Sequence, residues 1–262
     1  MLMQKKPLVS ILIANYNNSL YIQQCINSLN SQTYKNFEII FFDDNSSDNS
    51  LEIIKKFTNV KIIENKIQTK FASINQLNAF KKAFEISKGD LIFLLDSDDY
   101  FEKEKIGKVV NYFDNNKQAK IVFDCPFLVG GNDIYAEKAK DKFLKTYWPY
   151  IHPTSCISIK KDCFNEVINL ISYEDYTDVW SDLRICLFSK YILKDFHILN
   201  ENLTFYRKSD SNVSSKFKKF SKNWWKRRKQ AHQFFKKFSE DNGLSFNKNF
   251  DFFITKIICK FL

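Results

Sequence analysis

Short apolar segments alternate with amphipathic ones between residues 8 and 95, and this alternation leaves few folds open to the chain. The apolar segments have the length and the β-branched content of buried strands. They cover residues 8–14, 37–42, 60–64 and 91–95. Between them, apolar side chains recur at helical spacing over residues 20–29, 51–57 and 71–87. We therefore predict an α/β protein with a mostly parallel sheet flanked by helices.

The composition is that of a globular protein with one unusual segment. The chain has 262 residues, of which 44% are hydrophobic and 27% are charged. This length predicts one large domain, with or without a small extension. The formal net charge is +10, and residues 216–237 alone contain ten basic side chains and no acidic one. The rest of the chain is electrically neutral, which excludes a protein that is basic throughout.

Cysteine usage and hydropathy indicate where such a protein works. The six cysteines form no C-x-x-C pair, and a chain of this length does not need disulfides to fold, so we expect buried free thiols. No apolar run reaches the ~18 residues of a membrane span, and residues 1–7 lack the apolar core of a signal peptide. These features predict a cytoplasmic protein.

Two acidic clusters follow predicted strands at the point where each strand ends. Asp43 and Asp44 come after the second strand, and Asp96, Asp98 and Asp99 come after the fourth. Because ligands of a parallel sheet bind at the carboxyl ends of its strands, the clusters lie where a site is expected. Solvated surface turns are one explanation. A divalent cation, Mn²⁺ or Mg²⁺, that bridges a diphosphate is the alternative that the D-x-D-D pattern favours.

Three segments resemble the opening half of glycosyltransferase family 2. They are P-L-V-S-I-L-I-A-N-Y-N-N at residues 7–18, S-L-N-S-Q-T-Y-K-N-F-E-I-I-F-F-D-D-N-S-S-D at 28–48 and K-G-D-L-I-F-L-L-D-S-D-D at 88–99. Members of this family are inverting enzymes with the GT-A fold that use nucleotide sugars. The match covers residues 7–105 in order, and a thinner match extends to residue 212.

The resemblance implies a division of the chain. Residues 1–212 would form the GT-A catalytic domain, with the nucleotide-sugar-binding half at 1–105 and the acceptor half at 106–212. Residues 213–262 would form a basic amphipathic helical extension.

The resemblance also implies donor-binding residues. Ala14 and Tyr16 would line the uracil pocket, with Tyr16 stacked on the base, and Asp44 would accept a hydrogen bond from the uracil. Arg207 would reach the diphosphate from the end of the matching region, although an ordinary surface arginine is the alternative.

In the D-x-D motif, Asp96 and Asp98 would contact the ribose or the diphosphate, and Asp98 and Asp99 are the candidate metal ligands. Residues 70–78 replace the family's usual Gly-x-x-x-Ala-Arg-Asn stretch and depart from it.

An inverting transfer needs one general base, and a carboxylate suits the task. In the family this base comes from a Glu-Asp pair six residues before an arginine. Arg184 fits that arginine and points to Asp178, although Thr177 stands where the family has Glu. Asp182 is the second candidate and Asp175 the third. A helix cap or a solvated acid is the alternative for each.

The basic segment has three interpretations. If this segment forms a helix, several of its apolar residues lie on one side: Trp224, Ala231, Phe234, Phe235 and Phe238. This side could pack on the catalytic body, lie on an anionic membrane or accompany binding of nucleic acid. Residues 250–262 form a further candidate amphipathic helix.

Together these features predict a metal-dependent hexosyl- or hexosaminyltransferase. It would take a sugar from a nucleoside-diphosphate-sugar donor, a UDP-sugar, and transfer it to a saccharide or lipid-linked saccharide acceptor. The product would belong to bacterial cell-surface polysaccharide, lipooligosaccharide or glycan synthesis. It would sit peripherally on the inner face of the membrane and bind no nucleic acid. The alternatives are a catalytically silent sugar-nucleotide-binding or scaffold protein, and a nucleic-acid-binding protein that uses the basic segment.

Overall fold

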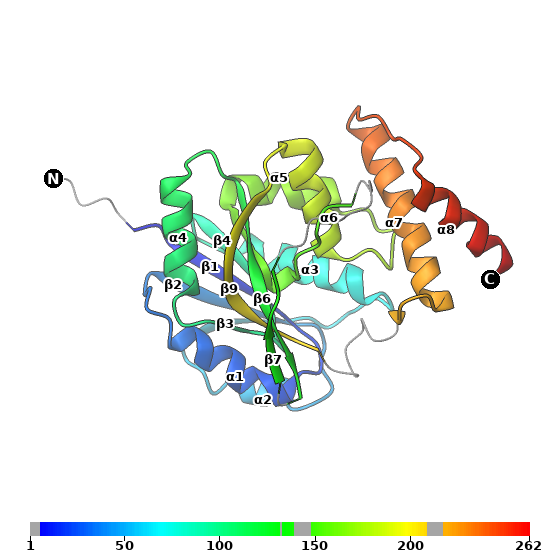
Figure 1. Cartoon of the computed structure of the whole chain (residues 1–262). Coiled ribbons are helices and arrows are strands. Elements are labelled where there is room, and N and C mark those ends of the chain that lie inside the picture. The colour runs from blue at the N-terminus through cyan, green and yellow to red at the C-terminus, as the bar shows by residue number, and fades with distance from the viewer. Residues whose placement is uncertain (1–5, 132, 139–147, 209–216) are drawn as a thin grey trace.

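A mixed β-sheet runs through the protein and carries helices on both faces (Figure 1). The computed structural model describes residues 6–131, 133–138, 148–208 and 217–262. In that part of the chain the strand order is β3-β2-β1-β4-β8-β6-β9-β5, with β7 paired to β6. The strands are β1 (Val9–Asn15), β2 (Phe37–Asp43), β3 (Val60–Glu64), β4 (Leu91–Asp96), β5 (Tyr100–Phe101), β6 (Ile121–Gly130), β7 (Asp133–Ala136), β8 (Ile157–Lys160) and β9 (His197–Arg207).

The first four strands are parallel, as the alternating pattern predicts. They are connected by α1 (Ser19–Asn30), α2 (Ser50–Ile54) and α3 (Ala72–Glu85). The pairing register aligns the ends of three strands, because Asn15 lies opposite Asp43 and Ala14 lies opposite both Phe42 and Asp96. Both acidic clusters therefore stand on one edge of the sheet.

The second half of the sheet is mixed and includes a strand that returns to the acidic edge. β8 pairs antiparallel with β4 and β6, β9 runs parallel to β6, and β5 pairs antiparallel with β9. Further helical segments are α4 (Lys105–Asn115), the turns η1 (Thr154–Cys156) and η2 (Ser189–Leu193), α5 (Lys161–Ile171) and α6 (Ser181–Phe188). Because Tyr100 pairs with Phe205, the end of β9 lies beside the D-x-D-D segment.

The core is divided by the sheet into two clusters because side chains alternate along each strand. Ile11 and Ile13 of β1 pack on the face covered by α1, α2 and α4, whereas Leu12 packs on the opposite face. That opposite face is covered by α3, α5, α6 and a C-terminal helix, α7 (Lys222–Asp241) (Figure 1).

A buried ion pair fastens the second half of the sheet to α4. The Lys105 Nζ lies 2.7 Å from a carboxylate oxygen of Asp124, and both side chains are fully buried. The same ammonium donates hydrogen bonds to the Ser155 carbonyl (2.6 Å) and to the Thr204 Oγ1 (2.5 Å). These bonds offset the cost of removing both charges from water.

Helix α7 packs its apolar side on the body of the protein. Ala231, Phe234, Phe235 and Phe238 are buried in the same core cluster as α6. The first interpretation of this side, packing, is therefore the one observed. The predicted domain boundary at residue 212 stays a prediction.

The last helix, α8 (Phe250–Phe261), is tied to α7 through its first turn. The Asp251 carboxylate accepts hydrogen bonds from the Arg228 Nε (2.8 Å) and the Trp148 Nε1 (2.9 Å). No helix in the described ranges is long and apolar enough to cross a membrane. The cysteines are free thiols, five buried and Cys259 partly exposed.

Candidate active site

Amide and hydroxyl side chains connect the carboxyl ends of β1, β2 and β4. The Asn15 Nδ2 donates to the Asp43 Oδ1 (2.7 Å), and the Asn15 Oδ1 accepts from the Ser97 Oγ (2.7 Å). The Asn18 Nδ2 donates to the same Ser97 hydroxyl (2.9 Å). Sequence reasoning missed these residues, and the only signal for them was the N-Y-N-N run directly after a strand. The network holds the acidic segments at fixed positions relative to one another.

The two acids after β2 have different surroundings. Asp43 is fully buried and accepts hydrogen bonds from the Ser46 backbone N–H (2.9 Å) and hydroxyl (2.6 Å), so it shapes the turn. Asp44 accepts from the Asn65 Nδ2 (2.7 Å) and the Gln68 Nε2 (3.2 Å), which fix the direction of its carboxylate. The Asp43 carboxylate is therefore occupied by hydrogen bonds that shape the turn.

The residues predicted for the uracil pocket lie together at this edge. The Asp44 backbone N–H donates to the Asn15 carbonyl (2.8 Å), which places Asp44 beside the end of β1. Tyr16 is the next residue and its side chain is 49% exposed, whereas Ala14 is half-buried. An exposed aromatic ring next to an oriented carboxylate is suited to stacking on a base and accepting one of its N–H groups.

The three carboxylates of the D-x-D-D segment are unequally satisfied. Asp99 is buried, and its two oxygens accept from the Ser155 hydroxyl (2.5 Å) and the Arg207 backbone N–H (2.8 Å). The Asp96 Oδ1 accepts from the Gln76 Nε2 (2.8 Å). Among the described residues, the Asp98 carboxylate accepts a hydrogen bond from its own backbone N–H and from no side chain. Asp98 and the second oxygen of Asp96 therefore have coordination capacity to spare.

The acidic cluster lacks sufficient positive charge of its own. Burial and the neighbouring Asp98 raise the pKa of Asp96 to about 7. Burial also raises the pKa values of Asp98 and Asp99, and in Asp99 the other two carboxylates add to the rise. A bound divalent cation would reverse these shifts.

The residues present fit such a cation with few protein ligands. The described part of the chain contains no group of three His, Cys, Asp or Glu side chains placed to hold a metal ion. Mg²⁺ and Mn²⁺ suit this situation, because they commonly bind through one or two carboxylates and take their other ligands from water and phosphate.

Arg207 lies directly beside the D-x-D motif. Its Nε donates to the Asp98 carbonyl (2.8 Å), and one terminal nitrogen donates to the Gln24 Oε1 (2.8 Å). The guanidinium stands 4.4 Å from the centre of the Tyr21 ring. These contacts hold a permanent positive charge at the acidic edge, where the sequence predicts the diphosphate.

The two leading base candidates stand in different places. Asp178 pairs with α7, because its carboxylate accepts from the Gln230 Nε2 (3.1 Å) and its backbone N–H donates to the Gln230 Oε1 (2.9 Å). Asp182 lies in the first turn of α6 and is connected to the D-x-D motif through one side chain. Gln76, which bonds Asp96, also accepts from the hydroxyl of Ser181 (2.5 Å), the residue before Asp182.

Charge confirms the proximity of Asp182 to the acidic cluster. Asp182 contributes to the raised pKa of Asp96, after burial and Asp98. Burial raises the pKa of Asp182 itself, and the positive charge of Arg227 on α7 opposes that rise. A carboxylate with a raised pKa is a stronger base than an ordinary aspartate once it is ionised. Asp175 is exposed to solvent.

Two further residues of the second half are structural. His152 is fully buried against Phe123, bonds the Asp124 carbonyl through Nδ1 (2.8 Å), and burial lowers its pKa to about 4. Arg184 is fully buried and donates to four backbone carbonyls that precede α6. They belong to Ile171, Tyr173, Tyr176 and Val179.

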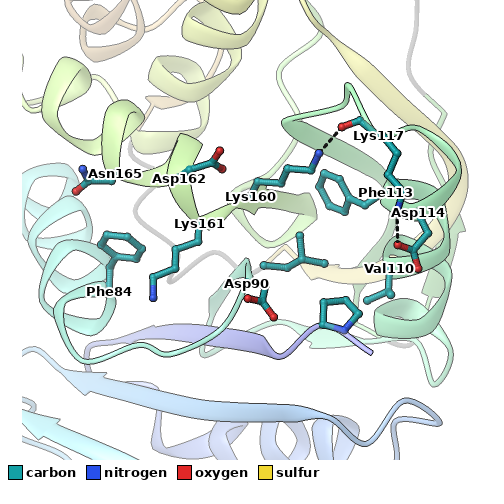
Figure 2. A pocket seen from close by; sticks show the side chains of 12 residues that line it. Phe84, Asp90, Val110, Phe113, Asp114, Lys117, Lys160, Lys161, Asp162 and Asn165 are labelled. Carbon is teal, nitrogen blue, oxygen red and sulfur yellow. Dashed lines mark hydrogen bonds and ion pairs between the residues drawn. The ribbon is translucent and has the colours of Figure 1, made fainter. Parts of the chain in front are cut away.

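A pocket lies away from these groups. Figure 2 shows a pocket of about 710 Å³ whose lining includes Pro7, Asp90 and Leu91, at the start of β1 and β4. One of its lysines, Lys160, donates to the Lys117 carbonyl (2.5 Å). Because parallel sheets bind ligands at the opposite edge, we place the candidate site at the carboxyl ends of the strands.

The fold and this edge define a class: an α/β protein with a mostly parallel sheet half whose strand ends carry acidic clusters. The family model described as Glycosyl transferase family 2 matches residues 10–180. The chain therefore belongs to glycosyltransferase family 2, and the predicted family, GT-A fold and enzyme class are confirmed.

Curated relatives support this assignment. An uncharacterized glycosyltransferase of Methanocaldococcus jannaschii is 30% identical over 82% of this chain and 76% of its own length. Another, from Nostoc, is 27% identical over 76% of this chain, which spans only 64% of that relative. An Escherichia coli UDP-Glc:alpha-D-GlcNAc-diphosphoundecaprenol beta-1,3-glucosyltransferase is 40% identical over 42% of this chain and 43% of its own length.

Solved structures share the fold. S. aureus TarS 1–349 in complex with UDP-GlcNAc has a TM-score of 0.63 and 17% identity, covering 86% of this chain and 66% of that one. The mannosyltransferase PcManGT of Pyrobaculum calidifontis, in complex with GDP-Man and Mn²⁺, has a TM-score of 0.58 and 11% identity, covering 98% and 70%.

Proposed function

We propose that this protein is an inverting, metal-dependent glycosyltransferase that moves a hexosyl or hexosaminyl group from a UDP-sugar to a lipid-linked saccharide in cell-surface glycan synthesis. The observation that carries the proposal is the Asp98 carboxylate, which accepts no side-chain hydrogen bond from a described residue and lies close to the charges of Asp96 and Arg207 at the sheet edge. The name of the E. coli relative, which specifies a UDP-sugar and a diphosphoundecaprenol acceptor, supports the choice of donor and acceptor.

The donor nucleotide binds across the ends of β1 and β2. Tyr16 stacks on the uracil, Ala14 lies beside it, and Asp44 accepts a hydrogen bond from the base. The contacts of Asn65 and Gln68 prevent Asp44 from rotating away. Asp96 accepts from the ribose.

Asp98 would hold the divalent cation, Mn²⁺ or Mg²⁺, and Asp99 would position Arg207 without touching the metal. Asp99 has this role because both of its oxygens already accept protein hydrogen bonds. When bound, the cation supplies positive charge to the diphosphate as it leaves. Arg207 adds a second positive group on the side of β9.

Asp182 is the general base, and Asp178 is the second candidate. In the reaction, the acceptor hydroxyl oxygen bonds to the anomeric carbon as the bond from that carbon to the diphosphate oxygen breaks. UDP leaves with the electron pair, and the hydroxyl proton passes to the Asp182 carboxylate. We prefer Asp182 because Ser181 and Gln76 connect its helix to Asp96, whereas the contacts of Asp178 are with α7.

The proposal is tested by measuring UDP release from a panel of UDP-sugars, with GDP-mannose as the comparison donor, in Mn²⁺, in Mg²⁺ and in EDTA. We expect one UDP-sugar to raise the melting temperature in the presence of metal, and to turn over with an undecaprenyl-diphosphate-saccharide acceptor. If no nucleotide sugar binds under any of these conditions, the proposed function is wrong.

A further inference from the structure

Helix α8 carries apolar side chains on two opposite sides. On the side facing α7, Thr255 is 1% exposed and the Phe252 ring lies 5.5 Å from that of His232. The Cys259 sulfur lies 3.4 Å from the Trp225 carbonyl of α7. This inner side accounts for the packing of α8 on the protein.

The other side of α8 forms what we call the outer stripe: Phe250, Phe253, Ile257 and Phe261. These residues are spaced three and four apart and therefore lie along one side of the helix. They are 80%, 49%, 56% and 85% exposed. A helix that is apolar on both sides is normally covered on both sides. No described residue covers the outer stripe, so its partner lies outside the described structure.

Positive charge borders the outer stripe. Lys256 and Lys260 are exposed on the same helix, adjacent in angle to Phe253 and Ile257. Lys226 and Lys229 of α7 stand close to Cys259, because their charges oppose the rise that burial causes in the pKa of its thiol. None of these four lysines forms an ion pair with a described residue.

Three further cations of α7 are paired. Lys236 and Lys237 pair with Glu240 and Asp241 on α7 itself, and Arg228 pairs with Asp251. Lys256 and Lys260 thus place unpaired positive charge next to the outer stripe, and Lys226 and Lys229 add positive charge on the α7 side of the same end of α8.

We propose that the outer stripe is a docking surface for an anionic lipid bilayer. The stripe would enter the interface between headgroups and acyl chains, while the lysine stems lie along it and place their ammonium groups among the lipid phosphates. A second copy of this chain fits less well, because the lysines of one copy would then face the same lysines of the other, and like charges repel. Nucleic acid would satisfy the lysines but leave the phenylalanines in water.

This surface is not the one expected from the sequence, because the apolar side of α7 is buried in the core. The purpose of docking rests on the proposed function: an enzyme held at the bilayer meets an acceptor that is anchored there.

The test is flotation of the full chain with vesicles of phosphatidylcholine alone, or of phosphatidylcholine with 30% phosphatidylglycerol. We expect binding to the anionic vesicles to be at least tenfold stronger and to weaken with salt. The double variant Phe253→Ser/Ile257→Ser should lose at least tenfold in binding. Lys256→Gln and Lys260→Gln should each lose about fivefold.

The matched control is Ile86→Ser/Ile134→Ser, which changes two exposed apolar residues outside α8 and should float like the wild type. Equal binding to neutral and anionic vesicles, or flotation of the stripe variant at the wild-type level, would overturn the proposal. So would sedimentation showing a wild-type dimer that the stripe variant abolishes, because a second copy would then be the occupant.

Docking and catalysis fail separately. UDP release with a short-chain, water-soluble acceptor should be the same in the stripe variant and the wild type without vesicles. Absence of flotation with intact transfer would reject the docking surface alone, whereas absence of transfer with intact flotation would reject the proposed function alone.

Discussion

The donor edge and the base side of the candidate site are built by different means. At the donor edge, residues at the ends of three adjacent strands bond one another directly, as Asn15 does with Asp43 and Ser97. On the base side, the surroundings of Asp178 and Asp182 come from Gln230 and Arg227 of α7. The donor edge lies inside the segment that the family model matches, and α7 lies outside it.

This difference predicts which side tolerates change. Strand register alone aligns the donor residues, so their positions depend only on the packing of the sheet and its core. The base side depends on a helix more than forty residues further along the chain, whose attachment rests on side-chain packing. Substitutions in α7 should therefore affect acceptor chemistry while leaving nucleotide binding intact.

The largest effect is expected at the donor edge, from Asp98→Asn. Loss of the metal carboxylate should lower turnover ~10⁴-fold, because several kcal/mol of charge stabilisation disappear. Turnover and the Mn²⁺ dependence of UDP binding, followed by calorimetry, measure this. Unchanged metal dependence in the variant would show that Asp98 is not the ligand.

On the base side, Asp182→Asn should lower turnover about 10³-fold, as loss of a general base does. The affinity for UDP should stay within about twofold of the wild type, since the donor edge is unchanged. Single-turnover kinetics with saturating donor provide the measurement. Full activity in this variant, together with loss of activity in Asp178→Asn, would transfer the role to Asp178.

A smaller effect is expected from the contact between Gln230 of α7 and Asp178. Gln230→Ala removes two hydrogen bonds to Asp178 and should lower turnover by up to about 30-fold, consistent with ~1 kcal/mol per bond. Gln233→Ala, an exposed glutamine on the same helix, is the matched control and should have no effect. If both variants behave alike, α7 does not support the base side.

The smallest effect concerns stability and pH. Burial raises the pKa of Asp182 above its unfolded value, so the folded state binds the proton more tightly and gains stability as the pH falls through that raised pKa. At pH 8, where the carboxylate is ionised, Asp182→Asn should therefore raise the free energy of unfolding of the metal-free protein. The gain should shrink toward pH 4 in urea unfolding experiments, and a variant that is less stable at pH 8 would contradict this assignment.

The sequence by itself determined the donor edge. Apolar runs of strand length place the parallel strands, and an acid that directly follows a strand must lie at the carboxyl edge. The two acidic clusters could therefore be placed at this edge from local pattern alone, whereas Tyr16 was named only through the resemblance to family 2.

Only the tertiary structure decided which way individual side chains turn. Asp99 is bonded to Ser155 and Arg207, His152 is buried against Phe123, and the base candidate nearest to Asp96 is Asp182. Each of these outcomes depends on a partner more than twenty-five residues away in the chain. Local spacing cannot reveal such a partner, because the direction of a buried polar side chain is set by whichever group completes its hydrogen bonds.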